Sequence, residues 1–262
     1  MLQIGKNILQ NPTPKVNMKL VSVTWSYFDE SNVEQSMLYQ SFIKHNKPED
    51  FINIHFNRSN FMDLEMDFEM RYGYQFEFLL YRIFLLKDRL LDMDSDVYIF
   101  SDTTDVVCLG KIDEIEYDET IKFSAERHQY PNDISSWGPV NSYSEDDLKN
   151  SNFLNAGLVI SKKELFVSLL ESVIEKVLPL NYRNFGGDQG VFTYYYTNKI
   201  QPEIFLDYER NVFVSTYLTG VDWYKLEGDK ICYKPTGSKP FFLHDNGWNY
   251  GSPKIIEHYK LS

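Results

Sequence analysis

The sequence lacks three features that would each point to a different class of protein. It has only two cysteines, Cys108 and Cys232, which are too few for the disulfide framework of a small secreted domain. It has no run of about 18 apolar residues, so we predict no membrane-spanning helix. Basic residues are also in deficit. The 26 Lys and Arg against 38 Asp and Glu give a net charge of −12, which argues against a protein that coats nucleic acid.

Apolar residues, in contrast, are plentiful. Hydrophobic residues make up 43% of the 262-residue chain and aromatic residues 16%, which excludes a disordered protein. Residues 1–17 contain Pro12 and Pro14 and no apolar signal core, so we expect an N-terminal arm there and a cytoplasmic protein. No linker or internal repeat divides the remainder, and we expect one domain over residues 18–262.

Strand and helix patterns alternate in the first half of the chain. The predicted strands are 19–25, 51–56 and 97–100, and the predicted helices are 31–42 and 74–91. Ser31 and Glu34 form a capping-box pattern at the start of the first helix. This alternation predicts an α/β fold with a mixed, mostly parallel central sheet flanked by helices.

The second half is less regular. The predicted strands are 121–124, 158–160 and 241–243, and the predicted helices are 161–177 and 188–197. Ser161 and Glu164 suggest a capping box for the first of these helices. Residues 129–150 form a long polar stretch without periodicity, and loops of that length in a compact domain are commonly lids or binding loops.

One acidic pair lies where a ligand site is expected. Asp102 and Asp105 directly follow the apolar strand 97–100, and ligands of parallel α/β sheets bind beyond the carboxyl ends of the strands. Two carboxylates at this spacing can share one hard cation. Taken alone, such a pair favours ordinary turn chemistry, but the apolar strand before it and the apolar residues 106–109 after it strengthen the case for a ligand site. The acidic run 92–96 precedes the strand and is interpreted as a solvated connection.

Several short blocks along the chain carry a family resemblance. In chain order they are Leu20–Thr24, Ser101–Asp105, Phe123–Glu126 with Tyr130-Pro131, Phe153–Gly157, Asp188–Phe192, Leu206-Asp207 and His244–Gly247. Together they resemble the glycosyltransferase domain of the lysyl hydroxylase/procollagen glycosyltransferase family, over roughly residues 19–250. The resemblance implies a GT-A, Rossmann-like domain that transfers a sugar from a nucleotide-sugar donor, usually a UDP-sugar, to an acceptor hydroxyl with Mn²⁺ or Mg²⁺.

The resemblance also implies roles for individual residues. The metal ligands would be Asp102, Asp105 and His244; the residues toward the nucleotide would be Thr24, Trp25, Arg82, Asp102, Asn246 and Gly247; the residues toward the sugar would be Asn155 and Asp188. If the reaction inverts the anomeric centre, Asp188 is the candidate general base. If it retains configuration, Asp188 positions the sugar while the departing phosphate assists the acceptor.

The chain departs from the family pattern at several positions. Gly186 and Gly187 stand where the family has further acidic residues, Asp245 replaces a glycine and adds charge near the cation, and Thr104 replaces an aromatic residue. These departures leave the donor sugar and the stereochemical course open. They also keep open a non-catalytic GT-A-like module that binds a glycan or a nucleotide.

Structural alternatives and several acceptors remain. His244 could be a hydrogen-bonded structural histidine, Asp188 a helix N-cap, and Asn155 a turn residue, and Asp207 is interpreted as structural. The acceptor could be a glycan, a protein side chain, a small molecule or a hydroxymethylated base in DNA. The net charge of −12 counts against DNA unless a basic cleft compensates locally.

Overall fold

A six-stranded sheet forms the centre of the fold. The computed structural model describes residues 16–25, 30–56, 78–129, 143–150, 152–180, 187–228, 230–246 and 255–261. The strands of the main sheet, in spatial order, are β2 (Phe51–Phe56), β1 (Met18–Trp25), β3 (Val97–Ser101), β6 (Phe153–Lys162), β5 (Ile121–Glu126) and β7 (Ile204–Leu206). Only β6 runs against the others, because it pairs antiparallel with both β3 and β5 while the remaining pairs are parallel. The predicted α/β class with a mixed, mostly parallel sheet is confirmed.

Smaller elements complete the fold. A three-stranded sheet has the order β4 (Val106–Cys108), β11 (Phe242–His244) and β8 (Phe213–Ser215), and β9 (Tyr224–Glu227) pairs with β10 (Lys230–Tyr233). The α-helices are α1 (Met37–Phe42), α3 (Phe78–Asp92), α4 (Glu145–Asn150), α5 (Lys163–Lys176), α6 (Asp188–Thr197) and α7 (Ile255–Tyr259). Within the described ranges, no helix has the length and apolar character needed to cross a bilayer.

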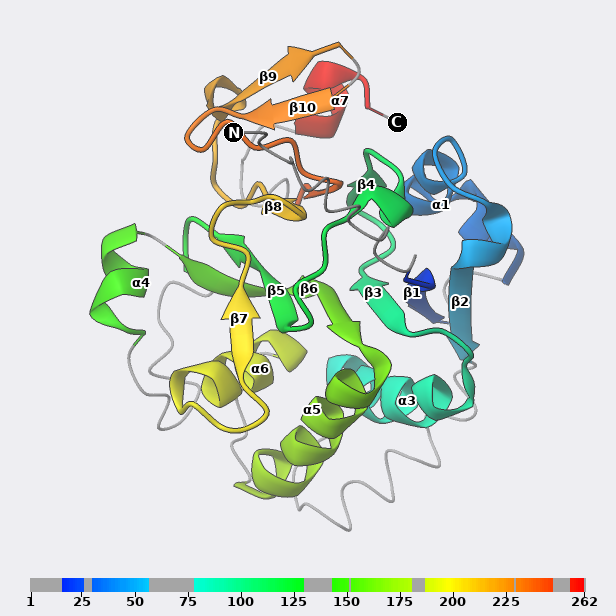
Figure 1. The fold of residues 1–262 in the computed structure, drawn as a ribbon, viewed down its shortest axis with the longest axis vertical. Coiled ribbons are helices and arrows are strands. Elements are labelled where there is room, and N and C mark those ends of the chain that lie inside the picture. The colour runs from blue at the N-terminus through cyan, green and yellow to red at the C-terminus, as the bar shows by residue number, and fades with distance from the viewer. Residues whose placement is uncertain are drawn as a thin grey trace, which may run out of the picture.

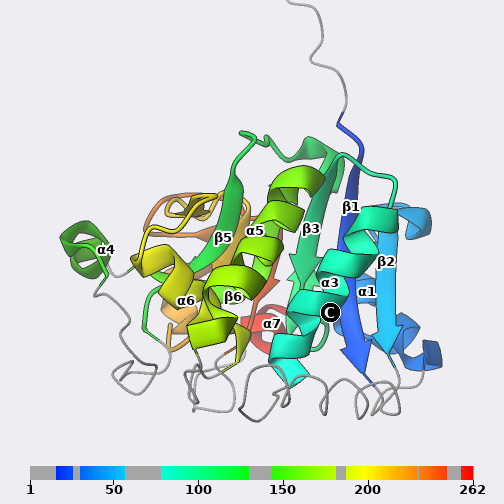
Figure 2. The same cartoon turned by 90° about the horizontal axis from the view of Figure 1, so that it is seen from below.

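The elements stack in layers on the two faces of the main sheet. Helices α3, α5 and α6 cover one face, as Figure 2 shows, and their apolar sides form a core with that face. Helix α1 and the three-stranded sheet cover the opposite face and form a second core (Figure 1). The outer side of the small sheet packs on β9, β10 and α7. Because β3 lies in the middle of these layers, all five of its residues are buried.

An irregularity in β6 shapes the edge of the sheet. Phe123 of β5 pairs with Val159, whereas the next residue, Ser124, pairs with Asn155. The extra length of β6 between these two partners is a bulge, and bulges re-aim side chains at strand ends. It places Asn155 and Gly157 beside the carboxyl end of β3, where the Asp102 backbone N–H donates to the Gly157 carbonyl (2.8 Å).

Several predicted boundaries are wrong. Helix α1 begins at Met37 and is capped by Ser36, whose hydroxyl accepts from the Tyr39 N–H, while 30–35 forms a 3-10 turn instead of the predicted capping box. Ser161 does not cap α5, because it lies in strand β6 and α5 has no side-chain cap.

The polar stretch 129–150 contains the short helix α4, which was predicted as loop. Its start carries a reciprocal capping box between Ser144 and Asp147, a pattern that is present in the sequence. The Ser144 hydroxyl accepts from the Asp147 N–H (3.1 Å), and the Asp147 carboxylate accepts from the Ser144 N–H (3.3 Å). Residues 130–142 of the stretch, and residues 1–15 of the predicted arm, lie outside the described residues. The domain boundary at residue 18 stays a prediction.

Candidate functional site

The carboxyl ends of β1, β3 and β5 meet at one edge of the main sheet, and the predicted site residues gather there. Asp102 and Asp105 lie in the short loop between β3 and β4, and His244 ends β11. Backbone hydrogen bonds hold the loop on two sides. The Asp102 N–H donates to the Gly157 carbonyl of β6, and the Asp245 N–H donates to the Asp105 carbonyl (2.8 Å). The hydroxyl of Thr103 also contacts that of Ser22 on β1.

Three side chains of this edge form a ligand set. Nε2 of His244 lies 3.3 Å from Oδ1 of Asp105 and 3.8 Å from Oδ2 of Asp102. One ligand atom from each of the three lies within 4.8 Å of the others. The His244 side chain is buried, whereas those of Asp102 and Asp105 are 27% and 24% exposed, so the set opens on one side. Two carboxylates and one imidazole fit a divalent cation that keeps open positions for a second ligand.

Gly157 makes room for this ligand set. A Cβ at this position would lie 2.3 Å from Cε1 of His244 and 2.6 Å from Oδ2 of Asp102, distances that real side chains do not tolerate. The absence of a side chain therefore lets the imidazole and the carboxylate approach the backbone of β6. We did not predict this role, although the glycine lies in the block 153–157.

The His244 ring is fixed by Asn155 beneath it. Oδ1 of Asn155 accepts from the Gly157 N–H (3.1 Å) and lies 3.0 Å from Nδ1 of His244. Nδ1 of His244 therefore donates, and Nε2 faces Asp102 and Asp105 as the available ligand atom. Burial lowers the pKa of His244, but Asp105 and Asp102 more than offset it and raise the pKa to about 9. A proton and a metal cation compete for Nε2, because the nitrogen can bind only one of them at a time.

The same charges act on Asp105. Burial raises the pKa of its carboxyl group, but His244, a backbone N–H and Arg82 together lower it by more, so the pKa lies below its usual value. Asp105 is therefore ionised at neutral pH and available as a ligand.

Arg82 and Asp188 form a second polar group next to the ligand set. Arg82 extends from α3 and contacts Asp102 through Nη1 and Asp188 through Nη2, and its Nε lies 3.1 Å from Oδ2 of Asp188. Asp188 is the first residue of α6, and the N-cap position belongs to Gly187, so the N-cap alternative for Asp188 is wrong. Burial raises the pKa of Asp188, and Arg82 offsets only part of this effect.

A fully buried carboxylate, Glu126, lies behind the site at the end of β5. Oε2 accepts from the amides of Asn155 (3.0 Å) and Asn246 (3.3 Å), and Oε1 accepts from the amide of Gln189 (3.1 Å). Burial without a cationic hydrogen-bond partner raises the pKa of Glu126 to about 8. We predicted no role for it, although it is an acidic residue that ends a buried strand directed to this edge, much as Asp102 comes directly after β3.

The remaining predicted residues have the following positions. Thr24 is buried at the end of β1 and contacts Asn53 (3.1 Å) and His55 (3.2 Å) of β2. The Trp25 side chain and Gly247 lie outside the described residues.

Two further aspartates have structural partners. The Asp245 carboxylate accepts from the Thr216 hydroxyl (2.6 Å) and the Ile256 N–H (3.2 Å). Asp207 accepts backbone N–H groups of residues 211–213, as its structural interpretation predicted.

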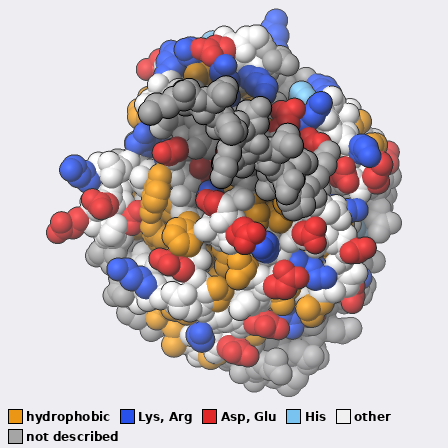
Figure 3. All heavy atoms as spheres, viewed as in Figure 1, with side chains coloured by type: hydrophobic (Ala, Val, Ile, Leu, Met, Phe, Trp, Pro, Cys, Tyr) orange, Lys and Arg blue, Asp and Glu red, His pale blue; other side chains and the backbone are white. Residues whose placement is uncertain are grey.

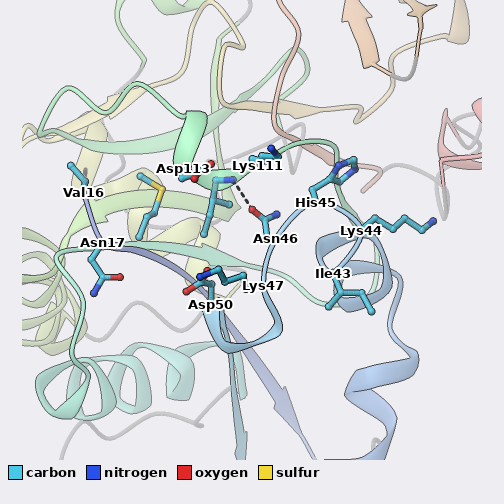
Figure 4. Close-up of a pocket in the computed structure, with 12 residues that line it drawn as sticks. Val16, Asn17, Ile43, Lys44, His45, Asn46, Lys47, Asp50, Lys111 and Asp113 are labelled. Atoms are coloured by element: carbon cyan, nitrogen blue, oxygen red, sulfur yellow. Dashed lines mark hydrogen bonds between the residues drawn. The ribbon is translucent and has the colours of Figure 1, made fainter. Parts of the chain in front are cut away.

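A hollow of about 650 Å³ lies away from this edge, near the amino ends of β1 and β2. Figure 4 shows Lys44, Lys47 and Lys111 around it together with Asp50 and Asp113. No predicted site residue lines it, so it is separate from the candidate site.

Comparisons with known proteins find similarity among solved structures but not among sequences. No family model matches the sequence. No curated protein matches it either. Among solved structures, the chain is similar to a glycosyltransferase involved in the glycosylation of the major capsid of PBCV-1. The two share 12% sequence identity over 93% of this chain and 100% of that chain, with a TM-score of 0.47. The resemblance to the procollagen glycosyltransferase family stays a prediction.

Proposed function

We propose that this protein is a glycosyltransferase that uses a divalent cation, Mn²⁺ or Mg²⁺, to transfer a sugar from a nucleotide-sugar donor, a UDP-sugar, to an acceptor hydroxyl. One observation carries the proposal. Asp102, Asp105 and His244 converge at the carboxyl edge of the sheet, next to a buried Arg82–Asp188 pair. A cation-binding set beside a guanidinium and a carboxylate offers partners for a diphosphate and for sugar hydroxyls in one place.

The cation would be held by Asp102, Asp105 and His244. When bound, it would act as a Lewis acid that stabilises the charge on the departing diphosphate. Asn155 keeps His244 Nε2 directed at this position, and Gly157 leaves the space that the imidazole needs. The exposed side of the two carboxylates leaves a diphosphate access to the site.

Asp188 would face the donor sugar. Its carboxylate is held by Arg82, which fixes its orientation and supplies a positive charge next to the diphosphate. In a retaining reaction Asp188 would position the sugar hydroxyls, and in an inverting reaction it would take the acceptor proton. Thr24 and Trp25, at the end of β1, would lie toward the nucleobase, and the Asn246-Gly247 backbone toward the diphosphate.

Glu126 and Asn155 would act from behind the site. Glu126 is fully buried and accepts three side-chain amides, so it holds Asn155, Asn246 and Gln189 in fixed orientations. Asn155 was predicted to contact the sugar, but its amide is engaged by Glu126, Gly157 and His244. We therefore assign Asn155 to the positioning of His244.

The acceptor is a hydroxyl on a glycan, a protein side chain, a small molecule or a hydroxymethylated DNA base. On the face shown in Figure 3, acidic and basic side chains are intermingled across the part that the structure describes. With a net charge of −12, this distribution favours an acceptor other than DNA. Retention on immobilised DNA at increasing salt tests the point, because phosphate contacts weaken steeply with salt.

The decisive experiment is donor turnover. A panel of UDP-sugars is incubated with the protein and Mn²⁺, and UDP release is measured for the wild type and Asp102→Asn. We expect release with at least one sugar, and none when Asp102→Asn or a chelator is used. Circular dichroism shows whether the variant keeps its fold. UDP binding without turnover of any sugar would favour a non-catalytic binding module.

A further inference from the structure

Arg82 divides its guanidinium between two carboxylates that would have different tasks. Its Nη1 contacts Oδ1 of Asp102, a residue of the ligand set, and its Nη2 contacts Oδ2 of Asp188, which is not part of that set. Arg82 and Asp188 are both buried, and Asp102 is half-buried. The three side chains therefore form one hydrogen-bonded group. A movement of the guanidinium changes the hydrogen bonds of both carboxylates.

This arrangement leaves Asp102 with only one oxygen for a cation. Oδ1 is taken by Arg82, and Oδ2 is the oxygen that faces His244. A charge-assisted hydrogen bond from a guanidinium is among the stronger polar interactions in proteins, and a cation must compete with it for the same carboxylate. The guanidinium also places a positive charge next to the position that the cation would take.

We propose that Arg82 is a resident counter-ion that competes with the divalent cation for Asp102, so that the protein alone binds the cation weakly and the nucleotide diphosphate is needed for tight binding. This inference rests on the proposed function. The diphosphate is a second anion that Arg82 can contact, and its arrival releases Asp102 to the cation. Cation and nucleotide binding are then linked through one side chain.

Three variants separate competition from two other effects of Arg82. In Arg82→Gln/Asp188→Asn, one positive and one negative charge are removed, so the net charge matches the wild type. In Asp188→Asn, Arg82 is left with Asp102 alone. In Arg82→Lys, the ammonium keeps the charge but lacks the planar fork that bridges two carboxylates. Mn²⁺ affinity without nucleotide is measured from the free-Mn²⁺ electron paramagnetic resonance signal, and again with UDP.

Competition predicts a definite order of affinities. The double variant should bind Mn²⁺ about tenfold more tightly than the wild type, as expected when a hydrogen bond to a charged group no longer competes. Arg82→Lys should bind it about threefold more tightly, because a single ammonium bond leaves Asp102 freer. Asp188→Asn should bind Mn²⁺ more weakly than the wild type. UDP should improve Mn²⁺ binding more in the wild type than in the double variant.

Other results overturn the inference. If Arg82 acted only through its charge, the double variant would bind Mn²⁺ with the same affinity as the wild type. If Arg82 oriented Asp102 for the cation, the double variant and Arg82→Lys would both bind Mn²⁺ more weakly. If the double variant fails to fold, Arg82→Lys alone decides between these outcomes. Failure of the wild type to bind Mn²⁺ even with UDP would contradict the proposed function as well, whereas UDP-dependent binding without the predicted order contradicts only this inference.

Discussion

Gly157→Ala is the substitution for which the structure gives the clearest expected effect. An added Cβ would lie 2.3 Å from Cε1 and 2.8 Å from Nδ1 of His244, and 2.6 Å from Oδ2 of Asp102. Carbon atoms in contact are separated by about 3.5–4.0 Å, so His244 or the β6 backbone must move by roughly 1 Å. Overpacking of this kind costs about 1–3 kcal/mol of stability.

We expect Gly157→Ala to impair ligand binding and turnover more than it impairs stability. A displacement of about 1 Å in a positioned group can reduce turnover on the order of 100-fold. We expect Gly157→Ala to lower Mn²⁺-dependent UDP binding at least tenfold, since both His244 and Asp102 are displaced. Calorimetry measures the affinity, and thermal unfolding confirms that the variant is folded.

Gly110→Ala is the matched control. It also adds a methyl group against a side chain, at 3.0 Å from Cδ1 of Phe241, but it touches no residue of the ligand set. It should leave Mn²⁺ and UDP binding unchanged. A folded Gly157→Ala protein with wild-type affinity for both would refute the role assigned to Gly157 and the geometry of the cation site.

Two other substitutions test the groups around the site. Burial raises the pKa of Glu126 from 4.5 to about 8, so between these pH values the folded protein keeps a proton that the unfolded chain releases. As pH rises from 4.5 to 8, the wild type should therefore lose roughly 2–5 kcal/mol of stability relative to Glu126→Gln. Urea unfolding of both proteins at pH 5 and pH 8 measures this change. A stability difference that is the same at both pH values would contradict the prediction. Asp207 accepts hydrogen bonds from the backbone N–H groups of Val212 and Phe213 at 2.8 Å each. Asp207→Ala should therefore lower the free energy of unfolding in urea by about 2–5 kcal/mol. A variant that keeps its stability but loses Mn²⁺ affinity would show instead that Asp207 belongs to the site.

Much of the fold could be predicted because local patterns dominate it. The strands β1, β2 and β3 and the helix α6 coincide with their predicted ranges to within a residue, since each is a short apolar run or a periodic segment between clear breaks. Strand β6 was predicted as three residues but has ten, because Asn155 and Gly157 interrupt the apolar pattern where the bulge forms.

The site was predicted less completely than the fold. Asp102 and Asp105 could be identified because they follow a buried strand, and His244 because of the family resemblance. The contact of Arg82 with both Asp102 and Asp188 depends on how α3 and α6 pack on the sheet, which no local pattern encodes. Glu126 could have been found by the rule used for Asp102. The direction of β5, which puts Glu126 at the same edge as Asp102, follows from its antiparallel pairing with β6, which is itself antiparallel to β3.

Calorimetric titration of UDP into the purified protein tests the central claim most directly. It is performed with Mn²⁺ and with a chelator, for the wild type and for Asp102→Asn. We expect UDP to bind the wild type tightly only when Mn²⁺ is present, and this binding to disappear in Asp102→Asn. UDP binding that is unchanged by the chelator or by Asp102→Asn would contradict a cation-dependent nucleotide site at this edge of the sheet.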